Sequence, residues 1–239
     1  MSVVVAVLAS GGGSNLQALL DRQAELGDRC RYRVALVIVD RASAGALERA
    51  RRAGVDTHVL ADHRDGATLA SLLDSCGASV VVLAGYLRLV PEAVTNRWVG
   101  RVVNVHPALL PAFGGAGMYG RRVHEAVIAS GARVSGATVH LVDEVYDRGR
   151  ILAQWPVPVF PHDTPESLAS RVLRVEHVLL PAVVEWLAEE QHHTSAGTGA
   201  FVDGSFSLRA DPRPDVSAIR SFATGETRTN PIAPDQRRD

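Results

Sequence analysis

The chain has 239 residues, of which 46% are hydrophobic and 5% aromatic, enough for one main globular domain with a sizeable core. Its 25 basic and 26 acidic residues nearly cancel, so the charge favours a small-molecule partner over a nucleic acid or an anionic membrane. All 25 of these basic residues are arginine, which excludes lysine Schiff-base chemistry and the lysine of a Walker-type phosphate loop.

The cysteines and the N-terminal segment both bear on the compartment. Two cysteines, Cys30 and Cys76, are too few for a disulfide scaffold and lack the spacing of a metal site. They favour a reducing compartment only weakly. The apolar run at 1–9 carries no positive charge and ends at three glycines, which is too short for a signal peptide or a membrane span. We therefore expect a soluble, cytoplasmic protein.

A glycine-rich loop follows the first predicted strand. Residues 3–9 form a β-branched run without alternation, which is typical of a central parallel strand buried on both faces. Leucines at helical spacing then predict a helix capped by Ser14 or Asn15. A glycine loop before a helix exposes backbone amides at the positive helix end, which suits a phosphate. A plain tight turn is an equal alternative, because glycine-rich turns are common.

A nicotinamide dinucleotide fits this loop less well. Gly11 and Gly13 have the spacing of the dinucleotide fingerprint, but Leu16 stands where its third glycine is needed. Asp40 ends the second predicted strand, where an acid that binds ribose would lie, so this alternative is weakened and not removed. A single phosphate group is the simpler prediction.

Strands and helices then alternate along the first half of the chain. This repeat predicts a doubly wound, Rossmann-like α/β sheet, mostly parallel and twisted, with helices on both faces. The expected strands lie at 34–39, 57–60 and 80–83, and the expected helices at 43–53 and from about 69 to 77. Residues 85–91 are apolar but broken by glycine and proline, which predicts a loop that lines a pocket.

The stretch RVVNVHPALLP at 101–111 predicts a buried strand that ends at Pro107. Alternation places Asn104 and His106 on one face, about 6 to 7 Å apart along the strand. The proline biases His106 toward an extended conformation, so its imidazole should stand where the strand leaves the sheet. Open α/β sheets bind their ligands at that end.

A second glycine-rich segment follows this strand. Four glycines between 114 and 120 predict an irregular loop, and apolar spacing predicts a helix at 121–129. His124 and Glu125 begin like a zinc-protease signature, but Ile128 stands where the second histidine is needed. No metal site is predicted there.

The last two predicted strands, at 135–142 and 151–156, are joined by the acidic connector 143–150. The connector is too short for a crossover helix, so the strands should pair antiparallel and give the sheet an antiparallel C-terminal part. Thr164 and Pro165 then predict the start of a long helix, which Pro181 should kink before it ends near residue 189.

Composition divides the chain near residue 190. We expect a catalytic domain over 1–190 and a C-terminal extension over 191–239 that is rich in Ser, Thr, Gly, Asp and Pro. Asp-Gly between apolar residues predicts a short hairpin near 201–208, and a disordered tail is expected from Asp211.

Asn104, His106 and Asp147 of the connector are candidates for a catalytic site. An imidazole can move protons, an amide can donate to an oxyanion, and a carboxylate can orient the histidine. The sequence shows no serine or cysteine nucleophile of the elbow type, so direct attack by a substrate nucleophile on a carbonyl is favoured. Taken singly, each residue is more often structural, since a histidine before proline caps or packs and an aspartate in a connector makes a turn.

Four motifs stand in order along the chain: SGGGSNLQ at 10–17, NVHPALLP at 104–111, GATVH at 136–140, and Asp147 two residues before Gly149. From residue 1 to about residue 187, the chain resembles the phosphoribosylglycinamide formyltransferase family, folate-dependent enzymes of purine synthesis. The resemblance implies the formyltransferase fold. It also implies transfer of a formyl group from 10-formyltetrahydrofolate to the amino group of glycinamide ribonucleotide.

The resemblance assigns roles to residues of this chain. Asn104 would stabilise the oxyanion, His106 would be the acid and base, and Asp147 would hold the histidine and a water. The ribonucleotide phosphate would lie on Gly13, Ser14 and Asn15, with Glu176 at the glycinamide end. The folate would contact Arg64, Arg88, Leu89, Val90, Asn104, Asp143, Glu144 and Asp147. No metal is implied, and the sequence leaves a homodimer open.

The connector departs from the family pattern. Many relatives have Asp-Thr-Gly-Pro or Asp-Gly-Gly-Pro where this chain has Asp-Arg-Gly-Arg at 147–150, and Phe113-Gly114 replaces a common aromatic-Pro pair. If Arg148 lies close to Asp147, its charge should lower the pKa of that carboxyl.

Three other functions remain as alternatives. Methionyl-tRNA formyltransferase and formyltetrahydrofolate hydrolase resemble the chain around 104–111, but each carries a further domain that does not fit this length and start. A nucleotide-binding regulatory protein without catalysis would need only the glycine loop, and it leaves Asn104, His106 and Asp147 unexplained.

Overall fold

The computed structural model describes residues 2–194, so the hairpin expected near 201–208 and the tail expected from Asp211 lie outside the described residues. Seven strands form one sheet: β1 (Val3–Ala9), β2 (Tyr32–Val39), β3 (Asp56–Val59), β4 (Val80–Leu83), β5 (Val102–His106), β6 (Val134–Leu141) and β7 (Ile151–Pro158). Their order across the sheet is β3-β2-β1-β4-β5-β6-β7.

The sheet is mixed, as the sequence predicts. The neighbours from β3 to β5 pair in parallel, while β6 pairs antiparallel with both β5 and β7. β1 lies between two parallel partners, and every residue in it except Val4 is buried. Its lack of alternation is therefore explained by burial on both faces.

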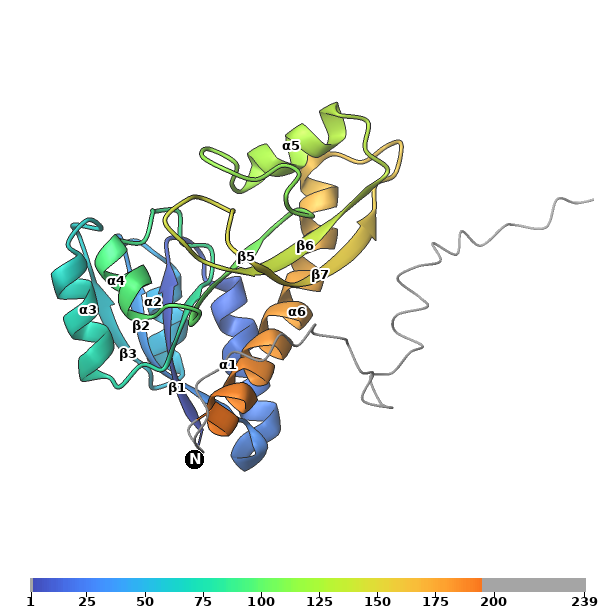
Figure 1. The fold of residues 1–239 in the computed structure, drawn as a ribbon. Coiled ribbons are helices and arrows are strands. Elements are labelled where there is room, and N and C mark those ends of the chain that lie inside the picture. The colour runs from blue at the N-terminus through green and yellow to red at the C-terminus, as the bar shows by residue number, and fades with distance from the viewer. Residues whose placement is uncertain (1, 195–239) are drawn as a thin grey trace, which may run out of the picture. The chain divides into compact units, whose positions relative to one another are not determined.

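Helices cover both faces of the sheet. Figure 1 shows α1 and α6 on one side of β1, and α3 and α4 on the other. The helices are α1 (Ser14–Leu26), α2 (Ala46–Arg52), α3 (Gly66–Ser75), α4 (Glu92–Arg97), α5 (Arg121–Ala129) and α6 (Pro165–Thr194), and a short 3-10 helix spans Gly27–Arg29. The predicted α/β class, with helices on both faces and an antiparallel C-terminal part, is confirmed.

Some boundaries differ from the prediction. The helix α4 was not predicted, because six residues after Pro91 are too few to show helical periodicity. The helix α6 runs without interruption through Pro181 and continues to Thr194, beyond the end predicted near residue 189. Apolar packing explains this continuity, since Leu179, Leu180 and Val183 around the proline are fully buried.

The strand order places a reversal between β1 and β4. The chain moves outward from β1 to β3 and then returns to β4 on the other side of β1. Such a reversal separates the loops that leave neighbouring strands and opens a crevice at their carboxyl ends, where open α/β sheets bind ligands.

Candidate active site

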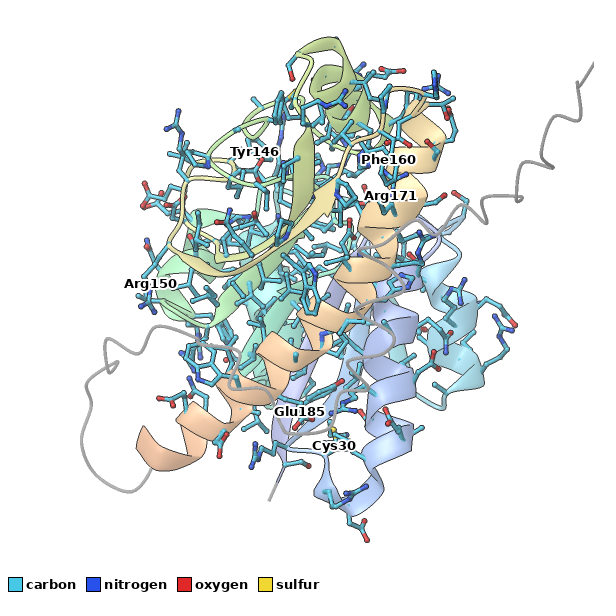
Figure 2. All side chains as sticks on the ribbon, turned by 90° about the vertical axis from the view of Figure 1, so that its right-hand side faces the viewer. Cys30, Tyr146, Arg150, Phe160, Arg171 and Glu185 are labelled. Atoms are coloured by element: carbon cyan, nitrogen blue, oxygen red, sulfur yellow. The ribbon has the colours of Figure 1, made fainter. Side chains whose placement is uncertain are left out.

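A pocket of about 650 Å³ lies at the carboxyl ends of β4 and β5. Its lining includes Gly85–Val90 of the loop after β4, which agrees with the predicted pocket loop, and parts of α5, α6 and the connector between β6 and β7. Tyr146 of this connector is one of the lining residues (Figure 2). The volume is within the usual range for small-molecule sites, roughly 300 to 1,000 Å³.

The three candidate catalytic residues meet in this pocket. Asn104 and His106 line it from the end of β5, and Asp147 reaches them from the connector. The Oδ2 atom of Asp147 lies 3.5 Å from Nδ1 of His106, and its Oδ1 atom lies 3.5 Å from Nε2 of His140. The carboxylate therefore stands between two buried imidazoles.

His140 enters the site through strand pairing. In the antiparallel register of β5 and β6, it lies directly opposite Asn104. The Nδ1–H of His140 donates to the carbonyl of Leu141 at 2.8 Å, so Nε2 is free to accept from Nδ2 of Asn104 at 3.1 Å. This contact fixes the orientation of the Asn104 amide and uses one of its two N–H groups.

His106 is held as a neutral imidazole. It is 3% exposed, and burial lowers its pKa from 6.5, although the charge of Asp147 and a bond to Phe113 oppose this effect. The Phe113 carbonyl can only accept, so the Nε2–H of His106 donates to it at 2.9 Å. A proton added to the ring must then enter Nδ1, which faces Asp147.

Asp147 is fixed by its backbone and by the second glycine-rich loop. Its φ of 56° is in the left-handed region, and its Oδ2 accepts the backbone N–H of Gly115 at 2.9 Å. Burial acts to raise the pKa of this carboxyl, but His140, His106 and the Gly115 N–H together lower it. Arg148 is exposed and is not among the causes of the shift, so the expectation that it lowers this pKa is not supported.

The first glycine loop differs in one detail from the prediction. The residue that caps α1 is Gly13 in a left-handed conformation, φ 74°, and no side chain caps the helix, so the predicted cap by Ser14 or Asn15 is wrong. Glycine is required at 13, because a Cβ there would lie 2.8 Å from Cα of Ala46. The side chain of Arg49 supports the loop by donating to the carbonyl of Gly12 at 2.7 Å.

Two of the four residues expected to bind the ribonucleotide reach the pocket. Asn15 and Glu176 line it and are joined by a hydrogen bond of 2.7 Å from Nδ2 of Asn15 to Oε2 of Glu176. Burial raises the pKa of Glu176, although the bond from Asn15 opposes this. Gly13 and Ser14 directly precede Asn15 but are not among the lining residues.

Of the residues expected to bind folate, some line the pocket and others do not. Arg88, Leu89, Val90 and Asp143 line the pocket, whereas Glu144 and Arg64 are exposed and do not line it.

Asp40 is already occupied by arginines. Nε of Arg88 lies 2.9 Å from its Oδ2, and Arg41 binds its Oδ1. The carboxylate is only 2% exposed, so it is not free for a ribose, which argues further against a dinucleotide site.

Two residues of the pocket were missed by reasoning from the sequence alone. His140 ends the motif GATVH, but the sequence predicts no role for it, because its contact with Asn104 depends on the register between β5 and β6. In the sequence, the only pattern that includes His124 is an incomplete zinc signature, yet this residue lines the pocket and is 4% exposed. The described residues contain no group of three or more His, Cys, Asp or Glu placed to hold a metal ion. Within residues 2–194, no helix is both long and apolar enough to cross a membrane.

Known proteins are similar to this chain in both sequence and fold. A family model described as formyl transferase matches residues 3–184. The chloroplastic phosphoribosylglycinamide formyltransferase of Vigna unguiculata is 44% identical over 193 residues, which are 78% of this chain; the chain spans 61% of the length of that relative. The phosphoribosylglycinamide formyltransferase of Escherichia coli (strain K12) is 36% identical over 208 residues, with 84% of this chain and 93% of the relative covered.

A solved structure agrees with these sequence matches. The glycinamide ribonucleotide transformylase 1 of Symbiobacterium toebii superposes with a TM-score of 0.73 at 42% identity, and the match covers 79% of this chain and 89% of that one. The family model, the relatives and the superposed structure are all formyl transferases. The chain belongs to the formyl transferase family.

Proposed function

We propose that this protein transfers a formyl group from 10-formyltetrahydrofolate to the amino group of glycinamide ribonucleotide, a step of purine biosynthesis. The observation that carries the proposal is the meeting of Asn104, His106 and Asp147 in the pocket of a formyl transferase family member. The names of the relatives support glycinamide ribonucleotide as the acceptor. Membership of the formyl transferase family supports 10-formyltetrahydrofolate as the formyl donor. A cytoplasmic location stays a prediction.

Asn104 supplies the charge stabilisation in this reaction. One N–H of its amide is used by His140, and the other can donate to the formyl oxygen as that oxygen becomes negative. Removing one such donor from an acyl-transfer site typically lowers turnover by about 100- to 1,000-fold. His140 is thus assigned a positioning role, because its Nε2 holds the Asn104 amide in this orientation.

His106 and Asp147 manage the proton. The attacking amine must lose a proton as its nitrogen bonds to the formyl carbon, and a neutral imidazole can accept it. The added proton enters Nδ1 of His106, where the Asp147 carboxylate, 3.5 Å away, stabilises the positive charge. The same proton is then available for the folate nitrogen that leaves.

The elements around Asn104, His106 and Asp147 form two sides of the pocket, and we assign one side to each substrate. We assign the ribonucleotide to the side built by α1 and α6, with its phosphate at the backbone of Gly13, Ser14 and Asn15. Glu176 lies at the glycinamide end. A 13-residue helix begins at Ser14, and its N-terminus attracts an anion.

We assign the folate to the side built by the loop after β4 and the connector. Leu89 and Val90 provide apolar surface for a pterin ring, and Arg88 and Asp143 lie beside them in the pocket lining. Arg64 and Glu144 lie outside the lining, so they would contact only a part of the folate that extends beyond the pocket.

A formyl-transfer assay tests the proposal. The purified full chain is incubated with 10-formyltetrahydrofolate, with and without glycinamide ribonucleotide, and the absorbance of the folate is followed. We expect loss of the formyl group only when the ribonucleotide is present. Loss that ignores the ribonucleotide would indicate the hydrolase, and ribonucleotide binding without turnover would indicate a regulatory protein; either result contradicts the proposal.

A further inference from the structure

His124 is a buried histidine in the pocket that the reaction above does not use. It lies on α5, is 4% exposed, and lines the pocket together with His106. Its Nδ1 atom is enclosed by protein and has no hydrogen-bond partner among the described residues. A polar atom that is buried without a partner costs stability, so the retention of a histidine here calls for an explanation. Nε2, the other ring nitrogen, is not among the enclosed atoms, so it is the atom that a ligand in the pocket can reach.

Few buried side-chain nitrogen and oxygen atoms of the described residues lack a hydrogen-bond partner. Among the side chains that the structure describes, in residues 2–191, four enclosed atoms have no partner: Asn15 Oδ1, His124 Nδ1, Ser135 Oγ and His177 Nε2. Two of them, on Asn15 and His124, belong to residues that line the pocket, and the other two do not. Asn15 is already a candidate for binding the ribonucleotide. His124, like Asn15, lines the pocket and carries a buried polar atom without a hydrogen-bond partner.

The surroundings keep His124 uncharged. Burial lowers the pKa of the ring from 6.5, and the neighbouring His106 lowers it further. Arg121, one turn earlier on the same helix, is paired with Glu125 and Glu166. A neutral imidazole offers one hydrogen-bond donor and one acceptor, which suits an amide or a hydroxyl group better than a phosphate.

The position of α5 indicates which substrate His124 faces. α5 packs against α6, and α6 packs against α1, so His124, Glu176 and Asn15 come from one connected group of helices (Figure 1). On α6, Glu166, Ala169, Leu173 and Glu176 recur at helical spacing and all line the pocket. None of the residues assigned to folate lies on these three helices, and most of them come from the loop after β4 and the connector.

We propose that His124 is a further substrate-binding residue, whose imidazole makes a hydrogen bond with an amide or hydroxyl group of the ribonucleotide. The inference rests on the proposed function, because it takes glycinamide ribonucleotide as the ligand of this side of the pocket. His124 supplies binding and orientation next to His106, while His106 handles the proton.

The test replaces His124 by phenylalanine, which keeps a buried ring and removes both hydrogen-bonding groups. Loss of one neutral hydrogen bond should raise the KM for glycinamide ribonucleotide by about 3- to 10-fold, with the KM for 10-formyltetrahydrofolate unchanged. His124→Gln can still form a hydrogen bond and should restore part of the affinity. Direct titration of the folded variants with glycinamide ribonucleotide alone should give the same ranking.

His177→Phe is the matched control. This histidine is also partly buried, has an unpartnered Nε2 and a pKa lowered by burial, but does not line the pocket. We expect its KM values to equal those of the wild type. An unchanged ribonucleotide KM in a folded His124→Phe variant would overturn the inference, and so would an equal rise in both variants.

A spectroscopic measurement covers the case in which the variant fails to fold. In the wild-type protein, the imidazole signal assigned to His124 should shift when glycinamide ribonucleotide is added and stay in place when folate alone is added. A signal that ignores the ribonucleotide overturns the inference. A wild type that does not bind glycinamide ribonucleotide at all contradicts the proposed function instead.

Discussion

At the scale of single residues, the site depends on the carboxylate of Asp147, which lies between the imidazoles of His106 and His140. Asp147 faces both His106 and His140, and the Gly115 N–H helps to keep it ionised. The negative charge that favours protonated His106 is opposed by burial, which keeps the free imidazole neutral. These opposing effects leave His106 able to accept a proton and then to release it.

Replacing His106 by alanine should lower turnover at least about 100-fold, which is in the usual range for an acid/base group. The measurement is the initial rate of formyl transfer at saturating substrate. His63→Ala is the control, since His63 lies outside the pocket lining and should leave the rate unchanged. Near-normal turnover in the His106→Ala variant would contradict the role assigned to this residue.

The buried histidines should also make stability depend on pH. Burial lowers the pKa values of His106, His124 and His177 below 6.5, so the unfolded chain binds protons more readily than the folded one as the pH falls. Stability from these groups is therefore complete above about pH 6.5 and declines as the pH falls through the folded pKa values. Denaturant unfolding should show a smaller loss between about pH 7 and pH 5 for His177→Phe than for the wild type. Equal losses in the two proteins would contradict the expected sign.

At the scale of secondary-structure elements, the antiparallel strands β6 and β7 bring the connector over the end of β5. The connector closes on β6 where the N–H of Leu141 donates to the carbonyl of Arg150 at 2.8 Å. Gly149 makes this closure feasible, because a Cβ at that position would overlap the carbonyl oxygen of Leu141. Gly149 is therefore needed to position Asp147 in the site.

Replacing Gly149 by alanine should push the connector away from β6 and destabilise the protein by about 1 to 3 kcal/mol. Turnover should fall at the same time, because Asp147 moves relative to His106. Urea unfolding and formyl-transfer rates measure the two effects. The neighbouring Arg148→Ala change, on an exposed side chain, is the control and should alter neither quantity appreciably. Wild-type stability and rate in Gly149→Ala would show that the close approach is relieved without cost.

The start of α6 is fixed by an ion pair. Arg171 donates to both carboxylate oxygens of Asp163 at 2.7 and 2.8 Å and to the carbonyl of Pro158 at 2.8 Å. Its guanidinium also lies 4.5 Å from the ring centre of Phe160, and Figure 2 shows the two side chains together. The Arg171 guanidinium holds the pKa of Asp163 well below its usual range.

Arg171→Ala should lower the free energy of unfolding by about 2 kcal/mol, since it leaves several acceptors without a charged donor. The control is Arg31→Ala, which removes a solvent-exposed pair with Glu189 and should cost less than about 1 kcal/mol. Both values come from urea unfolding at neutral pH. Equal losses for the two variants would show that the contacts at the start of α6 add nothing beyond a surface pair.

At the scale of the whole molecule, the pocket joins segments that are far apart in the sequence. All its lining residues fall between Asn15 and Glu176. We therefore expect that deletion of the residues from Asp211 onward leaves turnover and both KM values unchanged. The comparison is between the full chain and the shortened chain in the same assay. A collapse of activity or stability would place the deleted segment in the fold or in an interface.

Much of the fold could be predicted because it is determined locally. The strands β1 and β4 and the helix α5 have the predicted bounds, since a β-branched run or an apolar stripe ends in each case at glycine, proline or a polar cluster. Antiparallel pairing of β6 with β7 followed from the shortness of the connector. The start of α1 differs from the prediction because Gly13, in a left-handed conformation, takes the place of a side-chain cap, and sequence alone does not reveal φ.

The sequence by itself determined the alternation of strands and helices, the position of a glycine-rich loop before the first helix, and the common face of Asn104 and His106. These features depend on periodicities and turn chemistry within a few residues. Only the tertiary structure decided that His140 orients Asn104, that Asp147 lies between two imidazoles and that His124 enters the pocket. Each of these contacts joins side chains from separate elements, and their distances are set by strand register and helix packing rather than by any local pattern.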